Sequence, residues 1–201
     1  LEGRHRCDAV VLGAGMAGIL TAWFLRQHGL SVIVLEANRV GSGQTQNTTA
    51  KITAQHGLCY AKLIDRFGAQ DALRYARAAR QAVTDFRDII AQEHIACHLE
   101  TLPSYLYSRY DPTTLKQERD AACDLGFGAE FVKETCLPFP VEGAVVFPDQ
   151  AQFHPLEFLR GVSEPLVIYE HSKVTDVSDH QVSTAHGTVT DHYRRHQKGE
   201  A

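Results

Sequence analysis

The N-terminal stretch from Asp8 to Glu36 constrains the fold more than any other part of the sequence. An apolar run of strand length, Asp8-Ala9-Val10-Val11-Leu12, leads into a G-x-G-x-x-G turn that extends from Gly13 to Gly18. A helical pattern follows, and a second apolar run ends on the acid Glu36. A strand, a helix and a strand in this order predict a βαβ unit, and therefore an α/β fold with a parallel sheet.

Each glycine of the turn has a physical role in such a unit. Gly13 permits the tight turn, Gly15 lets the backbone approach a pyrophosphate, and Gly18 lets the helix lie close to the strand. The free N–H groups and the dipole at the helix N-terminus favour the negative diphosphate. Glu36 follows the second strand, where its carboxylate can accept hydrogen bonds from ribose hydroxyls but would repel the 2′-phosphate of NADP. NAD and FAD both remain as candidates, whereas a plain glycine-rich turn would not require Glu36.

Composition excludes several other classes of protein. The chain has 201 residues, enough for one domain or slightly more, and a net charge of −4 offers no basic face to nucleic acid. No apolar run approaches the roughly 20 residues of a membrane span, and the N-terminus contains no signal-peptide core. The five cysteines form no C-x-x-C pair and the histidines show no metal-ligand spacing. We therefore expect a cytoplasmic protein with reduced thiols and no metal site.

The segment 37–52 after Glu36 is a polar loop rich in glycine and hydroxyl groups. It follows the carboxyl end of the second strand, which is the edge of an open parallel sheet where ligands bind. A structured loop of this length is more often functional than a plain connection. We expect the loop to contact the cofactor. The alternative is a solvated turn followed by a helix that Thr48 or Thr49 caps.

The remaining elements follow from hydrophobic periodicity and from glycine and proline. A helical pattern covers residues 59–95 and breaks at Gly68, and a strand with a turn around Pro103 follows over 97–109. We expect further helices at 113–125 and 155–160 and a frayed polar tail at 191–201. Short strands are expected at 129–132, 143–147, 166–170, 172–177 and 181–185, with another beginning at 189–190.

Beyond these patterns, the βαβ unit resembles the FAD-binding entry of the D-amino-acid oxidase and glycine oxidase superfamily. The segment 39–53 is similar to the second FAD segment of those enzymes. Three further segments, 55–58, 137–141 and 149–155, resemble a bacterial subgroup whose full-length members carry a C-terminal Rieske iron–sulfur domain. The resemblance covers about residues 7 to 190, and its later segments are more specific than the widely shared first one.

The resemblance implies FAD as the cofactor and assigns residues to it. The glycine turn and Glu36 would hold the pyrophosphate and the ribose, the loop would follow the diphosphate towards the isoalloxazine, and Val174 would meet the adenine through its backbone. The implied cofactor-binding residues are Gly13, Gly15, Met16, Ala17, Gly18, Glu36, Ala37, Arg39, Gly43, Thr48, Thr49, Ala50, Lys51 and Val174.

No catalytic residue follows from the sequence. Lys51 could place a positive charge near the flavin and favour its reduced anion, and His56 could line the active site. The alternatives are a solvated loop lysine and a packed or surface histidine.

The implied architecture is a Rossmann-type FAD-binding domain interrupted by part of an inserted antiparallel substrate-domain sheet. We expect residues 1–96 to form the FAD-binding part with helices, 97–153 to enter the substrate-side sheet, and 154–190 to return, followed by the polar tail 191–201. A later strand and a glycine-rich segment of the family are missing, as are the C-x-H and C-x-x-H pairs of a Rieske cluster. The sequence therefore resembles an N-terminal piece of a longer enzyme.

The leading hypothesis is the FAD-binding portion of a flavin-dependent oxidoreductase that oxidises a C–N bond of an amine or amino acid. Its electron acceptor would be oxygen or an iron–sulfur domain that this sequence lacks. A second hypothesis is a non-catalytic or truncated nucleotide-binding module. A third, an NAD-dependent dehydrogenase, is disfavoured because no second βαβ half is visible before residue 190.

Overall fold

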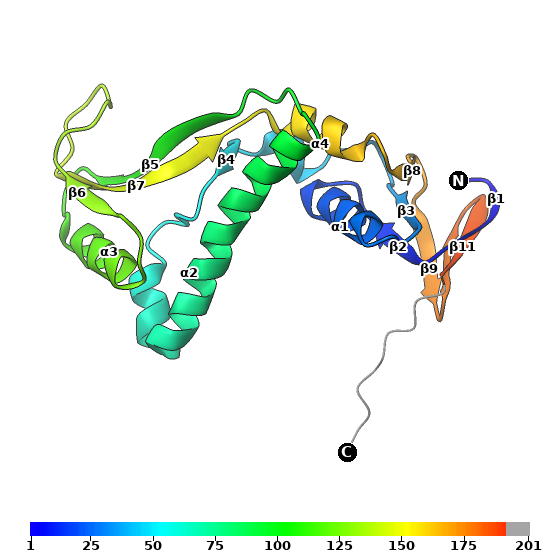
Figure 1. The fold of residues 1–201 in the computed structure, drawn as a ribbon, viewed down its shortest axis with the longest axis horizontal. Helices are drawn as coiled ribbons and strands as arrows, with labels where there is room; N and C mark the ends of the chain where they lie inside the picture. Colours follow the sequence, from blue (N-terminus) through cyan, green and yellow to red (C-terminus); the bar gives the residue numbers. More distant parts are fainter. Residues whose placement is uncertain (192–201) are drawn as a thin grey trace, which may run out of the picture. The chain divides into compact units, whose positions relative to one another are not determined.

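A computed structural model describes residues 1–191 of the protein, which divide into two compact units (Figure 1). Unit 1 contains residues 1–49, residues 95–97 and the chain from residue 155 onward. Unit 2 contains residues 50–94 and 98–154. Unit 1 contains two sheets and unit 2 contains one, and each unit has helices of its own.

Unit 1 is built on the predicted βαβ unit. Strands β2 (Ala9–Leu12), β3 (Val32–Leu35) and β8 (Val167–Tyr169) form a parallel sheet in the order β2-β3-β8. All four residues of the central strand β3 are buried, as expected of a parallel strand covered on both faces. Helix α1 (Met16–Gln27) connects β2 to β3 and buries one face, which includes Ile19, Ala22 and Trp23. The α/β fold predicted for this stretch is confirmed.

A second sheet of unit 1 includes a strand that the sequence analysis missed. Its order is β1 (Gly3–Cys7), β11 (Gly187–Asp191), β10 (Gln181–Thr184) and β9 (Val174–Ser178). Strands β9, β10 and β11 are antiparallel neighbours, whereas β1 pairs with β11 in parallel. The pattern of residues 3–7 is polar, and only pairing with a distant segment makes it a strand.

Helix α4 (Pro155–Ser163) is longer than predicted, because it continues beyond the expected end at Arg160. The buried residue Val162 follows Leu159 by three residues and Phe158 by four, so it extends the same apolar face by another turn. Gly161, on this added turn, lies against Ile95. The apolar spacing therefore continues to Val162, and the helix ends one residue later at Ser163.

Unit 2 contains the long helix α2 (Tyr60–Gln92), which changes direction at Gly68 (Figure 1). Gly68 has a φ of +81°, which confirms the predicted break because this conformation is easily adopted only by glycine. Helix α3 (Thr113–Asp124) ends before Gly126, as the sequence predicted. Both helices contribute to a core with β7, made of buried residues including Tyr60, Ala72, Ala76, Leu115, Ala122, Val145 and Phe147.

The antiparallel sheet of unit 2 has β7 (Gly143–Gln152) at its centre. Strand β5 (Glu100–Ser108) pairs with one edge of β7, and β4 (Lys51–Ile52) and β6 (Glu130–Val132) pair with the other. Two expectations were wrong in detail. Strand β7 continues past Phe147, and β5 runs through Pro103 with only a shift of register, because Pro103 lies on an edge strand where its missing N–H is tolerated.

The boundary between the units differs from the one that the sequence analysis drew. Residues 50–94, which were grouped with the βαβ unit, belong by their contacts to unit 2. The reason is that β4 pairs with the end of β7 and α2 packs in the same core as α3. Whether the units correspond to cofactor and substrate domains stays a prediction.

Within residues 1–191, no helix is long and apolar enough to cross a membrane. The same residues contain no group of three or more His, Cys, Asp or Glu side chains that could hold a metal ion. The frayed tail predicted for 191–201 lies outside the described residues, apart from Asp191 at the end of β11.

A buried carboxylate on α3 organises the start of α2. The side chain of Glu118 is 1% exposed and accepts three backbone hydrogen bonds, from the N–H groups of Cys59 (2.9 Å), Tyr60 (2.8 Å) and Ala61 (3.0 Å). These N–H groups have no partner inside the helix, and they carry the positive end of its dipole. Glu118 therefore joins α3 to the N-terminus of α2.

We expect Glu118→Ala to lower the free energy of unfolding by about 3 kcal/mol or more, because it removes charge-assisted bonds to three helix N–H groups. Glu118→Gln, which keeps one acceptor oxygen, should lose less. Urea unfolding followed by circular dichroism measures both. Gln117→Ala, at an exposed position of the same helix, is the matched control. Equal stabilities for Glu118→Ala and the control would contradict the assignment.

Candidate nucleotide-binding site

The glycine turn between β2 and α1 has the backbone geometry that its sequence predicts. Gly13 has a φ of +96°, and its N–H donates to the carbonyl oxygen of Leu35 at the end of β3 (2.8 Å). A Cβ placed on Gly18 would overlap the carbonyl oxygen of Gly13, so only glycine lets α1 start this close to the turn. The N-terminus of α1 is thereby held at the carboxyl end of the parallel sheet.

The space beside Gly15 is nearly open. A Cβ placed there would meet only the Thr45 hydroxyl, at 3.5 Å. That hydroxyl also accepts a hydrogen bond from the N–H of Met16, the first residue of α1 (3.2 Å). Thr45 is buried and was not among the predicted site residues. Its only sequence signal was its place in the polar loop after Glu36.

Glu36 closes the turn from the other side. One carboxylate oxygen accepts from the N–H of Ala14 (2.7 Å), and the second accepts from the N–H of Asn38 (2.8 Å). The carbonyl oxygen of Glu36 accepts from the N–H of Ser172, just before β9 (2.8 Å). Val174, the first residue of β9, packs against the cluster that contains Leu35. Unit 1 therefore brings Glu36 to the glycine turn, and the bond from Ser172 ties the segment before β9 to Glu36.

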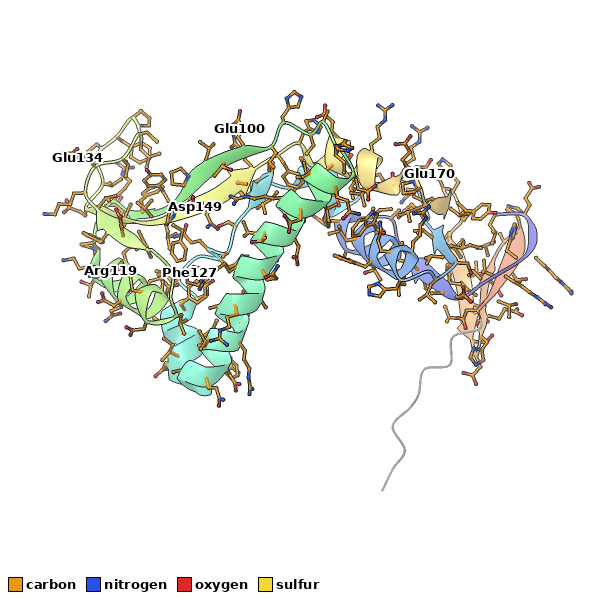
Figure 2. The ribbon with its side chains drawn as sticks, viewed as in Figure 1. Glu100, Arg119, Phe127, Glu134, Asp149 and Glu170 are labelled. Atoms are coloured by element: carbon orange, nitrogen blue, oxygen red, sulfur yellow. The ribbon has the colours of Figure 1, made fainter. Side chains whose placement is uncertain are left out.

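The loop after Glu36 is anchored to the turn and to Glu170, the residue that follows β8. Gly41, at a φ of +71°, donates its N–H to the carbonyl oxygen of Ala14 (2.9 Å), and Val40 donates to the carboxylate of Glu170 (2.7 Å; Figure 2). The predicted residues Ala37, Arg39, Gly43, Thr48 and Thr49 all lie along this loop.

The alternative reading of the loop, in which Thr48 or Thr49 caps a following helix, is wrong. A short 3-10 helix, η1 (Gln44–Asn47), precedes Thr48, and strand β4 follows Thr49. The segment is thus a structured connection, held by backbone bonds, at the carboxyl edge of the parallel sheet.

Two predicted residues and both catalytic candidates belong to unit 2. Ala50 adopts a φ of +60°, and Lys51 is exposed at the start of β4. Lys51 lines a cavity of about 220 Å³ on the sheet, together with residues that include Thr53, Ser104 and Tyr105.

His56 does not line that cavity. It is exposed, and its Nδ1 lies 3.0 Å from the hydroxyl of Tyr75. Burial raises the pKa of the Tyr75 phenol above its ordinary value, so the phenol stays protonated and can donate to His56. The structure therefore does not bring Lys51 and His56 together in one site.

The family model of the DAO FAD-dependent oxidoreductases matches residues 8–197 of this chain. The chain belongs to this family. Because the match begins at the first residue of the apolar run before the turn, the glycine turn and Glu36 both lie within it.

Known relatives extend well beyond the length of this chain. A protein of Bacillus subtilis (strain 168), YhfW, whose name describes it as a Rieske 2Fe-2S iron-sulfur protein, is 35% identical over 184 residues, which are 88% of this chain and 36% of that protein. Crystal structures of glycine oxidase from Geobacillus kaustophilus and L-proline dehydrogenase from P. horikoshii share the fold, with TM-scores of 0.72 and 0.74 at 18% identity. They are matched over 93% and 95% of this chain, but over 54% and 52% of their own.

The residues of unit 1 fit the cofactor of the family. The first turn of α1 has no acidic residue and Gly15 provides no side-chain cap, so a diphosphate at the start of α1 would meet N–H groups there, while the one carboxylate bonded to the turn, that of Glu36, lies at the N–H of Ala14. The open side of Gly15 leaves room for that approach. Glu36 keeps lone pairs available for ribose hydroxyls, because each oxygen accepts only one of the hydrogen bonds described above.

We expect Gly18→Ala to destabilise unit 1 by several kcal/mol, of the order of 3 kcal/mol, because the new Cβ forces α1 away from the turn. Gly43→Ala is the matched control, since a Cβ there meets nothing within 4 Å. Thermal unfolding monitored by Trp23 fluorescence reports on α1 directly. If both variants unfold at the same temperature as the parent chain, the close approach at Gly18 does not support the fold.

Proposed function

We propose that unit 1 binds FAD and that the protein serves as the FAD-binding part of an oxidoreductase acting on a C–N bond of an amine or amino acid. The observation that carries the proposal is the glycine turn. Its open face lies at the N-terminus of α1, and Glu36 is hydrogen-bonded to the N–H of Ala14 within the same turn. This combination suits a diphosphate joined to a ribose.

Each part of the turn would perform a separate task in binding. The N–H groups of Met16 and Ala17 would donate hydrogen bonds to the diphosphate at the start of α1. The N–H of Met16, which donates to the Thr45 hydroxyl in this structure, would then donate to the diphosphate instead, or to both acceptors. Glu36 would accept from the adenosine ribose. The exposed guanidinium of Arg39 would add positive charge along the loop, and the backbone of Val174 would meet the adenine.

FAD is favoured over NAD by membership of the family, whose description names FAD as the cofactor. FAD, when bound, accepts a hydride equivalent from the substrate. The chain's own residues would hold and orient it, and its electronic properties would depend on nearby charge. An NAD-dependent dehydrogenase would use the same turn and the same acid, so a direct comparison of the two cofactors separates the alternatives.

The substrate class rests on similarity and on the cavity of unit 2. Glycine oxidase and L-proline dehydrogenase, which share the fold, carry amino acids in their names. The cavity next to Lys51 is lined by residues that carry hydroxyl groups, Thr53, Ser104 and Tyr105, and such a lining suits a small polar molecule. We therefore propose a small amine or amino acid as the substrate.

The electron acceptor would be oxygen or an iron–sulfur group. The similarity to YhfW supports the second choice, because the name of that protein describes a Rieske 2Fe-2S iron-sulfur protein. The chain spans about a third of YhfW, so such a group would reside in a segment or a partner outside residues 1–201.

Cofactor binding is tested with Gly15→Ala. The new methyl group faces only Thr45 at an ordinary contact distance, so the fold should be unaffected, whereas the space for the diphosphate is filled. We expect the purified chain to bind FAD, measured by quenching of flavin fluorescence, and Gly15→Ala to bind it at least about tenfold more weakly. Unfolding temperatures of the two chains should agree.

NADH titrated in parallel decides between the cofactors. Binding of NADH without binding of FAD would replace the proposal with the dehydrogenase alternative. If neither nucleotide binds to a chain that circular dichroism shows to be folded, the proposal fails for this chain. FAD binding without bleaching by any amine or amino acid would favour the non-catalytic nucleotide-binding module.

The role of Lys51 is tested by the rate of flavin reduction. In the FAD-loaded chain mixed anaerobically with amino acids and amines, we expect Lys51→Met to slow the bleaching of the oxidised flavin band about tenfold, because a nearby cation stabilises the reduced anion. Lys62→Met, a lysine on α2 outside the cavity, is the matched control. An unchanged rate in Lys51→Met would leave Lys51 as a solvated strand residue.

A further inference from the structure

Unit 2 contains a second cavity, distinct from the one at Lys51, between one face of α2, the turn after α3 and β7. Its volume is about 250 Å³. Phe127 and Asp149, two of its lining residues, are labelled in Figure 2 on the side of the sheet towards α2. No residue assigned to FAD binding lines this cavity, and Gln150 is the one lining residue that it shares with the cavity at Lys51.

Two arginines of α2 line the cavity from the same side of the helix. Arg80 and Arg87 are seven residues apart, which is two helical turns, so they project from one face. Nη2 of Arg80 donates to the carbonyl oxygen of Leu125 (3.3 Å), and the guanidinium lies 4.8 Å from the centre of the Phe127 ring. Carbonyl and aromatic contacts orient this charge but do not neutralise it.

Arg87 is held in a similar way. Its Nη2 donates to the carbonyl oxygens of Asp149 (2.6 Å) and Gln150 (3.2 Å). Its Nε is buried and has no hydrogen-bond partner among the described residues. Within residues 1–191, neither Arg80 nor Arg87 forms an ion pair with a carboxylate. Both arginines therefore retain donors that an anionic ligand could satisfy.

The remaining walls favour a small molecule with an apolar part. Gly126 and Gly128 carry no side chains, and Gly126 has a φ of +84°, so the turn keeps this region open. Apolar side chains, including Val83, Phe127, Phe147 and Pro148, form the other surfaces. The cavity thus combines apolar walls with fixed polar groups, and small-molecule sites use the same two components.

We propose that this cavity is a binding site for a small molecule bearing an oxyanion, a carboxylate or a phosphate, held by Arg80 and Arg87. The guanidinium groups pair with either anion, and Phe127 and Val83 would contact an attached apolar group.

The carboxylate of Asp149 limits the affinity of the cavity for an anion, and replacing it tests whether the ligand is an anion or a cation. It is the one carboxylate among the lining residues, so it reduces the positive charge that the two arginines provide. An anion bound here experiences repulsion from Asp149, and the Asp149→Asn variant should therefore bind it more tightly, whereas a site for a cation would respond in the opposite direction.

The experiment uses the 201-residue chain with inorganic phosphate and with phenylacetate as probes. Binding is measured by titration calorimetry. Protection of individual arginines from phenylglyoxal, measured by mass spectrometry, gives the location. We expect Arg80→Gln to weaken binding at least about tenfold, Arg80→Lys to weaken it less, and Asp149→Asn to strengthen it severalfold. Arg77→Gln, an exposed arginine of α2 outside the cavity, is the matched control.

The outcomes separate this proposal from FAD binding. The anion site is supported if a probe protects Arg80 and Arg87, but not Arg77, from phenylglyoxal. The same protection in the Gly15→Ala chain supports the site whether or not FAD binds. Tighter binding of phenylacetate assigns a carboxylate ligand, and tighter binding of phosphate assigns a phosphorylated one. The proposal is overturned if neither probe changes the extent of phenylglyoxal modification at Arg80 or at Arg87. That readout needs no substitution, so it decides the matter even if Arg80→Gln fails to fold.

Discussion

The close approach of α1 to the glycine turn is the constraint on which unit 1 depends. Because Gly18 has no Cβ, the helix starts directly against the carbonyl group of Gly13. The N–H of Gly13 then reaches Leu35 on the neighbouring strand, and the N–H of Ala14 reaches the carboxylate of Glu36. One missing methyl group thus fixes the helix N-terminus, the turn and the acid in a single arrangement, and the candidate nucleotide site is that arrangement.

The N-termini of α1 and α2 differ in the groups that accept hydrogen bonds from their first N–H groups. The first N–H groups of α2 donate to the buried carboxylate of Glu118, which satisfies them permanently and supplies the negative charge that the dipole favours. The start of α1 receives only the neutral hydroxyl of Thr45 and no acid. The difference is physical: the N-terminus of α2 is part of the core, whereas the N-terminus of α1 stays available to an external anion.

Much of the local structure could be predicted from sequence patterns. The βαβ unit, the break at Gly68 and the end of α3 before Gly126 all depend on residues close together in the chain. The two misses have different causes. Strand β1 exists only through its pairing with β11, a distant segment, so residues 3–7 carry no local pattern that reveals it. The extra turn of α4 does continue a local spacing, because Val162 follows Phe158 and Leu159 by four and three residues, and the predicted end at Arg160 was set too early.

The sequence by itself determined the family, the parallel βαβ unit and the residues at the glycine turn, because backbone conformation and close approach at Gly13 and Gly18 depend on the absence of side chains. Only the tertiary structure placed the Thr45 hydroxyl at the start of α1, Glu118 at the start of α2, and the arginines of α2 around a cavity of their own. These positions depend on which distant segments pack together. The free energy of that packing comes from burying the apolar surface of the whole chain, which no local pattern of the sequence specifies.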